Sequence, residues 1–290
     1  MSPMETRESI IQLIRNRRTQ LPTLSVVLDN ILQIAADDRT SAQDLAEFIQ
    51  QDQAIAHKIL RLANSAYYGL ARKVDSITRA ITIIGFNEVV SLTLGMGMFS
   101  TLGRRTKQSG LDMRELWLHS IASGSACRIL GLRLGHEEPN RLFICGLLHD
   151  TGKVLLAAYF TAAYESLLGA AASSETPLQR IEKDHLGLDH AEVGALLMEQ
   201  WHFPPSLVLP CRYHHDDSEC PPPLLQDTAI VEVANAVAHK AELGQSGNPA
   251  PDEPERGLER LGLPSSILDE LSLEILKQQE RMEGFLEAAA

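Results

Sequence analysis

A histidine, an aspartate and a lysine stand close together in the run Leu148-His149-Asp150-Thr151-Gly152-Lys153. This run follows the apolar stretch 142–148, so the sequence predicts that it is buried. Burying charged side chains without partners costs several kcal/mol for each charge. Two arrangements would supply those partners. One is a metal ion held by His149 and Asp150, and the other is a network of hydrogen bonds that only resembles a metal site.

Further histidines lie on other predicted helices, and nine of the ten histidines come at or after residue 119. On helical periodicity, five histidines and one aspartate could face one interior: His119, His149, Asp150, His190, His214 and His215. Imidazole and carboxylate groups suit zinc, iron, manganese or nickel. Taken singly, each histidine could instead be a hydrogen-bonded core residue, and the pair 214–215 could be a solvated helix end. The remaining late histidines are assigned to surface or capping positions: His136, His185, His202 and His239.

The elements that would position these side chains are all predicted to be helices, because apolar residues recur at helical spacing and no segment alternates as a strand does. Asp189 and Glu192 form a capping box at the start of one helix. The basic, glycine-bounded segment 103–110 marks a division between two halves. In the second half the predicted helices cover 112–134, 139–149, 152–170, 176–184, 189–201, 204–213, 224–242 and 265–286.

Composition excludes several classes of function. The chain has 290 residues, 44% of them apolar, and a formal charge of −12, which argues against general binding to DNA or RNA. The four cysteines show no metal-binding spacing and are interpreted as buried thiols. The N-terminus does not resemble a signal peptide, and no stretch approaches the ~20 apolar residues that span a bilayer. We therefore expect a cytoplasmic protein.

Several motifs together resemble the HDOD family, a relative of the HD-superfamily metal-dependent phosphohydrolases. His119 followed by His149-Asp150 resembles the opening of the HD pattern. The narrower resemblance rests on Leu21-Pro22-Thr23-Leu24, Ile49-Gln50-Gln51-Asp52, Leu60-Arg61-Leu62-Ala63-Asn64-Ser65, the run 77–85, Asp189-His190-Ala191-Glu192-Val193-Gly194, Trp201-His202-Phe203-Pro204 and His214-His215.

The resemblance implies an all-α fold with an HD-like helical core and an additional N-terminal helical lobe. It predicts an N-terminal helix (1–19) and an HDOD domain (20–243), which divides into an N-terminal lobe (20–105) and an HD-like lobe (111–243). A flexible loop (244–257) and a C-terminal helix (258–290) follow. The resemblance also implies that His190, His214 and His215 correspond to the extra histidines of dinuclear and trinuclear relatives.

Two departures from the enzymes bear on the chemistry. The last metal-binding aspartate of the HD pattern is matched by Asn235, a neutral amide and a poor ligand beside a carboxylate. Two divalent ions would then share one carboxylate, Asp150, so one ion is expected rather than two. In addition, no Gly-Tyr-Pro motif follows the HD pair, which removes the main sequence support for a cyclic-di-GMP phosphodiesterase.

Two functions remain. The favoured one is a regulatory protein of bacterial signal transduction with a metal-capable pocket, which binds a signalling protein or senses a nucleotide or phosphate. The 64–69 stretch is its candidate partner surface, with a loop packed on the core as the alternative. The second function is a metal-dependent phosphohydrolase acting on a phosphomonoester, nucleotide or cyclic nucleotide. In that enzyme Asp150 would hold the metal and Lys153 would neutralise a phosphate oxygen; otherwise Lys153 is a solvated helix residue.

Overall fold

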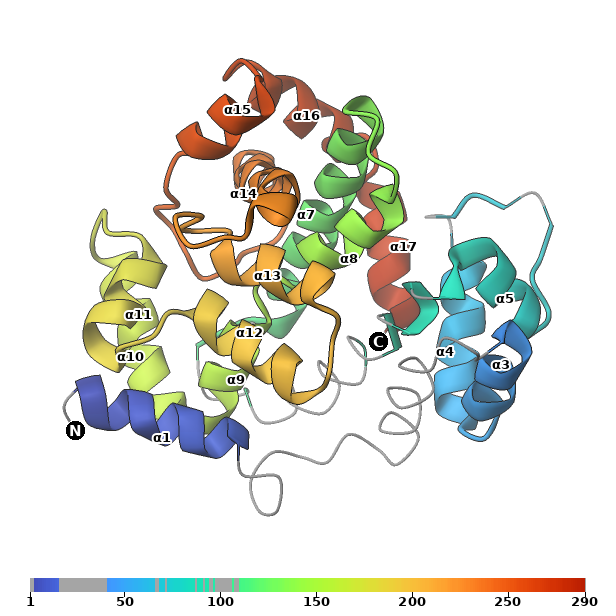
Figure 1. The fold of residues 1–290 in the computed structure, drawn as a ribbon, viewed down its shortest axis with the longest axis horizontal. Coiled ribbons are helices and arrows are strands. Elements are labelled where there is room, and N and C mark those ends of the chain that lie inside the picture. Colours follow the sequence, from blue (N-terminus) through green and yellow to red (C-terminus); the bar gives the residue numbers. More distant parts are fainter. Residues whose placement is uncertain are drawn as a thin grey trace. The chain divides into compact units, whose positions relative to one another are not determined.

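The computed structural model describes residues 3–15, 41–65, 68–70, 72–86, 88–90, 92–93, 96, 106 and 110–289. Every regular element in these residues is a helix, which confirms the predicted all-α class (Figure 1). The chain divides into two compact units, Met1–Leu21 with Leu102–Lys277, and Pro22–Thr101 with Gln278–Ala290. Residues 16–40, which include the Leu21-Pro22-Thr23-Leu24 motif, lie outside the described residues.

The unit built on residues 22–101 and 278–290 contains α3 (Ala42–Gln50), α4 (Gln53–Ala63), α5 (Ile77–Ile84) and α17 (Gln279–Ala289). Side chains cap the first two helices, because Ser41 and Asp44 form a capping box and Asp52 accepts from amides in the first turn of α4. Asn64 bonds both the amide and the carbonyl of Val74, so it holds the connection to α5. This favours the packing interpretation of the 64–69 stretch at Asn64, while residues 66 and 67 lie outside the described part.

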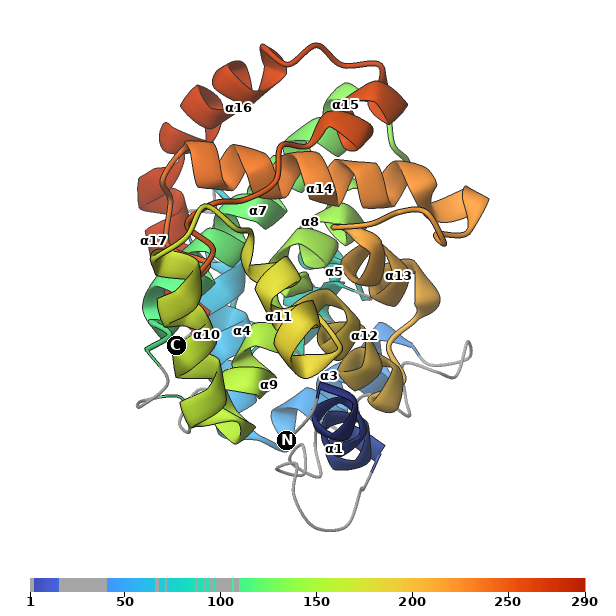
Figure 2. The ribbon, with the colours of Figure 1, turned by 90° about the vertical axis from the view of Figure 1, so that its left-hand side faces the viewer.

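The other unit contains α1 (Pro3–Arg15) and the helices from residue 113 to residue 276. These later helices are α7 (Met113–Arg133), α8 (Pro139–Leu148), α9 (Thr151–Tyr159), α10 (Thr161–Ala172), α11 (Leu178–Leu186), α12 (His190–Gln200), α13 (Pro205–Tyr213), the 3₁₀ turn η2 (Pro222–Leu224), α14 (Leu225–Lys240), α15 (Glu255–Leu261) and α16 (Ile267–Leu276). α7 packs on α8, and α14 lies across both (Figure 2).

Glycines allow the closest helix approaches in this unit. A Cβ on Gly146 of α8 would lie 2.7 Å from the Cα of Gly124 of α7. A Cβ on Gly152 of α9 would lie 1.9 Å from the carbonyl oxygen of His190, at the start of α12. Real Cβ atoms do not approach backbone atoms this closely, so both crossings require glycine. The second crossing sets the position of the Asp150 segment against the start of α12.

Three predicted elements differ in the structure. The helix predicted over 152–170 is interrupted at Phe160, in an aromatic and β-branched run that favours helices weakly. The single helix predicted near 265–286, within the range 258–290, is replaced by α15, α16 and α17. The supposed flexible loop 244–257 is packed: Ser246 and Asn248 are buried, and the Asn248 side chain accepts from the Leu178 amide.

Within the described part of the chain, one stretch is long and apolar enough to cross a membrane, contrary to the sequence interpretation. This stretch runs over Pro139–Tyr159, and 89% of its window is buried inside the protein. It includes the charged pair Asp150 and Lys153, and its helices α8 and α9 are packed inside the unit that contains α7 and α14. We therefore interpret it as a pair of core helices.

Candidate metal centre

The histidines and the aspartate singled out in the sequence converge in one unit, from four places in the chain. His119 comes from the middle of α7, and the pair His149-Asp150 lies between the end of α8 and the start of α9. His190 is the first residue of α12, and the pair 214–215 follows α13. The ligand atoms form two groups, each with its members within 4.8 Å of one another: His119, His149 and Asp150; and His190, His214 and His215.

Two of the imidazoles are oriented by the backbone. The Nδ1 atoms of His149 and His214 lie 2.8 and 2.5 Å from the carbonyl oxygens of Gly146 and Cys211. A carbonyl only accepts, so each Nδ1 carries the proton and each Nε2 keeps its lone pair. Both Nε2 atoms are buried without a hydrogen-bond partner. Buried lone pairs with this orientation fit a divalent transition metal.

Asp150 is 1% exposed, and its carboxylate is shared among several groups. Its Oδ2 accepts from the Lys153 ammonium at 2.7 Å and lies 3.4 Å from His149 Nε2. Burial alone would raise the pKa of Asp150, but His149 and Lys153 hold this pKa well below its usual value. Lys153 is only 2% exposed, so the alternative of a solvated helix residue is wrong.

Asn235 of α14 completes the surroundings of the first group. Its Oδ1 lies 3.0 Å from His119 Nε2. Because an amide oxygen accepts, this contact requires a proton on His119 Nε2. Burial, with His239 nearby, holds the pKa of His119 well below its usual value, so the ring is neutral. The nitrogen that would face a metal here is therefore engaged as a donor.

A buried acid that the sequence analysis missed orients His190. Glu182 of α11 is fully buried and accepts from the Nδ1 of His190 at 2.6 Å and from Tyr164 at 2.8 Å. Burial would lower the pKa of His190, but the Glu182 carboxylate raises it to about 9. A signal for Glu182 existed: it shares an i, i+4 stripe with Leu178 and Leu186, so it lies on the buried face of a helix that otherwise has many charges.

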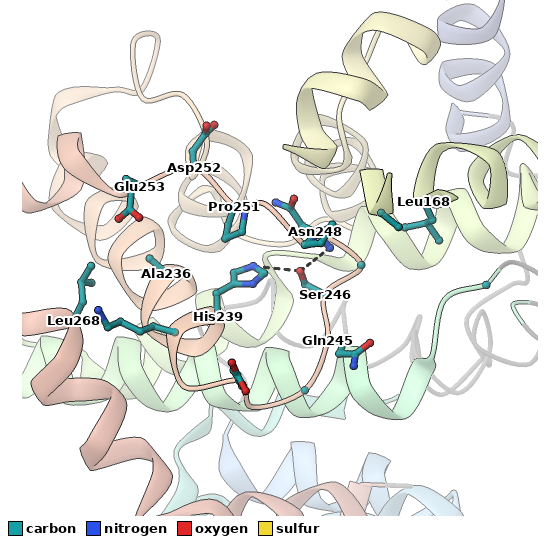
Figure 3. Close-up of a pocket in the computed structure, with 17 residues that line it drawn as sticks. Leu168, Ala236, His239, Gln245, Ser246, Asn248, Pro251, Asp252, Glu253 and Leu268 are labelled. Carbon is teal, nitrogen blue, oxygen red and sulfur yellow. Dashed lines mark hydrogen bonds between the residues drawn. The ribbon is translucent and has the colours of Figure 1, made fainter. Parts of the chain in front are cut away.

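His239, assigned from the sequence to a surface or capping position, is half-buried and packs beside the first group. Its ring centroid is 4.7 Å from that of His119, and burial lowers its pKa to about 4. Figure 3 shows it beside Ser246, whose hydroxyl is 3.2 Å from His239 Nε2 and also accepts from the Asn248 amide. These residues line a pocket of about 880 Å³. The sequence did carry a signal for the position of His239: it lies four residues after Asn235, which places both residues on one face of α14.

A second pocket, of about 680 Å³, is lined by His214, His215 and Asn235. Its other lining residues include more acids than bases: Asp189, Asp216, Glu232, Asp252, Glu253 and Glu255 against Arg180, Lys183 and Arg256. The bases are already paired, since Arg180 bonds Asp252 and Arg256 bonds Asp216. This charge balance favours the approach of a cation over that of a phosphate.

Glu232, in the wall of this pocket, makes stability depend on pH. Burial raises its pKa from 4.5 to about 7, so the folded protein retains a proton that the unfolded chain has lost. Stability should therefore fall as pH rises from 4.5 to 7. We expect Glu232→Gln to raise the free energy of unfolding by about 1–2 kcal/mol at pH 8 and by little at pH 4.5. Urea denaturation at both pH values measures this, and Glu137→Gln, at an exposed site, is the control. An equal gain at both pH values would contradict the assignment.

Comparison with known protein families shows that the model of the HDOD domain matches residues 21–217. Among curated proteins, an uncharacterized protein of Treponema pallidum (strain Nichols) is 26% identical over 230 residues, which cover 76% of this chain and 43% of that protein. The uncharacterized protein YuxH of Bacillus subtilis (strain 168) is 23% identical over 117 residues, which cover 40% of this chain and 28% of YuxH. The chain thus spans less than half the length of either relative.

Solved structures with the same fold include three that cover nearly the whole chain. An HDOD domain protein of unknown function from Geobacter sulfurreducens matches with a TM-score of 0.75 at 22% identity, over 97% of this chain and 99% of its own. A proposed phosphohydrolase from Shewanella amazonensis SB2B matches with a TM-score of 0.73 at 22% identity, over 97% of this chain and 98% of its own. A proposed signal transduction protein from Marinobacter aquaeolei VT8 matches with a TM-score of 0.76 at 20% identity, over 99% of this chain and 65% of its own. At these identities the likeness establishes the fold alone.

Proposed function

Because this chain belongs to the HDOD family, we propose that it is a regulatory protein of bacterial signal transduction. In this proposal the HD-like helices bind a divalent transition metal, or sense a nucleotide or phosphate, and a signalling protein reads the bound state. The metal would be held by members of the set His119, His149, Asp150, His190, His214 and His215. Iron, manganese, zinc and nickel all suit such ligands. The four cysteine thiols are free, and we propose that the protein acts in the cytoplasm, where thiols stay reduced.

One observation carries the regulatory proposal. The only carboxylate among the six candidate ligands, Asp150, is bonded to the buried ammonium of Lys153. At the position of the second carboxylate, the amide of Asn235 contacts His119. A dinuclear hydrolytic centre needs anionic ligands to offset two divalent ions. Here one carboxylate is already balanced by a lysine and the other is replaced by an amide, so binding is favoured over turnover.

Phosphohydrolase activity is the second candidate, and the Glu182 network favours it. Glu182 and Tyr164 hold His190 in one orientation, as supporting residues do around metal ligands. A bound metal would supply a water of lowered pKa. In such an enzyme Lys153 would have to leave Asp150 to reach a phosphate oxygen.

Metal content and turnover distinguish the two functions. The wild-type protein and Asp150→Ala are purified without a nickel column, and their metal is measured by mass spectrometry. Both are then tested on a phosphomonoester, a nucleotide, a cyclic nucleotide and a phosphodiester. We expect at most one ion per wild-type chain and no turnover above that of Asp150→Ala. Hydrolysis by the wild type that is absent in Asp150→Ala would overturn the regulatory proposal in favour of the enzyme.

A further inference from the structure

The two groups of candidate ligands are not equally able to accept a metal. In the first group, His119 Nε2 is a donor to Asn235, and Asp150 Oδ2 is bonded to Lys153. To bind an ion there, the imidazole must change its tautomer and the carboxylate oxygen must be shared with an ammonium. His149 Nε2 has no hydrogen-bond partner, whereas in His119 the nitrogen without a partner is Nδ1 and not the Nε2 that contacts Asn235.

In the second group the ligand atoms contact one another and Asp150, and none of them is engaged by a side chain outside this set. The Nε2 atoms of His190 and His215 lie 2.9 Å apart, and that of His214 has no hydrogen-bond partner. The other oxygen of Asp150, Oδ1, lies 3.2 Å from His190 Nε2 and makes no hydrogen bond. Three imidazole nitrogens and one free carboxylate oxygen thus converge. Such a set suits a four-coordinate divalent ion such as zinc or cobalt.

Supporting contacts also favour the second group. His190 Nδ1 bonds the buried carboxylate of Glu182, and His214 Nδ1 bonds the carbonyl of Cys211. Each contact directs an Nε2 atom toward the others, and Glu182 adds a negative charge behind the ligands. In the first group, by contrast, the Lys153 ammonium adds a positive charge at Asp150 Oδ2.

We infer that one divalent transition-metal ion binds to His190, His214, His215 and Asp150 Oδ1, and that the His119–His149 side of the site takes up no ion. In this arrangement Asp150 uses its two oxygens for two partners: Oδ1 contacts the metal, and Oδ2 accepts from the Lys153 ammonium. The inference rests on the metal-capable form of the proposed function. It adds which residues hold the ion and what keeps a second ion out.

Cobalt titration of metal-free protein tests the assignment, because bound Co²⁺ absorbs visible light according to its ligands. Equilibrium dialysis of the same samples measures stoichiometry. We expect one Co²⁺ per wild-type chain. His214→Ala should weaken binding by at least about 100-fold, whereas His119→Ala should bind one ion within a few-fold of wild type with the same spectrum. His214→Gln repeats the test should the alanine variant fail to fold by circular dichroism.

Asn235→Asp supplies the converse test. Replacing the amide by a carboxylate gives the first group its missing anionic ligand, so we expect a second Co²⁺ to bind. The inference is overturned if His119→Ala loses the ion while His214→Ala keeps it, if both variants lose it, or if Asn235→Asp still binds one ion. A wild-type chain that takes up no Co²⁺ would overturn both the assignment and the metal-dependent form of regulation. Hydrolysis by a singly loaded wild type would overturn the regulatory function alone.

Discussion

Replacing Asp150 by alanine should lower the free energy of unfolding of its unit by about 3–5 kcal/mol. The variant leaves the ammonium of Lys153 buried without its anion, and removing one partner of a buried pair costs more than removing both. The two tryptophans, Trp117 and Trp201, belong to this unit, so their fluorescence follows its unfolding in urea. The measurement is made with a chelator present, so that metal binding does not contribute.

A double-mutant cycle separates this effect from loss of packing. Lys153→Met in the Asp150→Ala background removes the unpaired charge, so we expect the double variant to be more stable than Asp150→Ala alone by about 2 kcal/mol. Lys240→Met is the control, since Lys240 pairs with Asp269 at the surface and its loss should cost less than about 1 kcal/mol. A double variant less stable than Asp150→Ala would show that Lys153 contributes through something other than its charge.

Replacing Gly152 by alanine should have a comparable effect for a steric reason. The new methyl group would overlap the His190 carbonyl and crowd the Gly194 amide, so α9 and α12 must move apart. Overpacking against backbone costs about 3 kcal/mol, because a main-chain carbonyl cannot rotate away as a side chain does. The movement would also separate Asp150 from His190, so we expect metal affinity to fall together with stability. Urea denaturation and cobalt titration measure the two effects.

Gly169 offers the matched control. It lies within α10, and an added Cβ there meets no atom within 4 Å. Gly169→Ala should therefore raise the free energy of unfolding by about 0.5–1 kcal/mol through helix propensity alone, with no change in cobalt affinity. If both alanine variants behave alike, the close approach of α9 to α12 does not govern the site.

Much of the fold could be predicted because the signals were local. The capping box of Asp189 and Glu192 predicted a helix start, and α12 begins at the next residue, His190. The convergence of the histidines also followed from helical periodicity together with a known family pattern. Both the helix start and the inward-facing histidines could be predicted without knowing which helices cross, because each signal lies within one helical segment.

The parts that could not be predicted depend on contacts between distant segments. Glu182 resembles its charged neighbours along the chain, and its role appears only when α11 lies beside the start of α12. The bond from Lys153 to Asp150 joins residues close in the sequence. The sequence alone did not distinguish it from a solvated lysine, because that distinction depends on the segments that bury Lys153. The 244–257 segment has the composition of a mobile loop, but contacts with α7, α11 and α14 hold it in place.

The 244–257 segment also decides how the protein can be shortened for experiments. The family match ends at residue 217, yet Arg256 bonds the backbone of His215 and the side chain of Asp216 from beyond that boundary. A fragment cut to 21–217 would discard Asn235, His239 and the helix that covers α7, together with α1, whose Ile10 and Ile14 are buried. The family match and the compact unit that holds the histidine cluster therefore cover different lengths of chain, and recombinant fragments intended to keep this cluster need to begin before α1 and extend past α16.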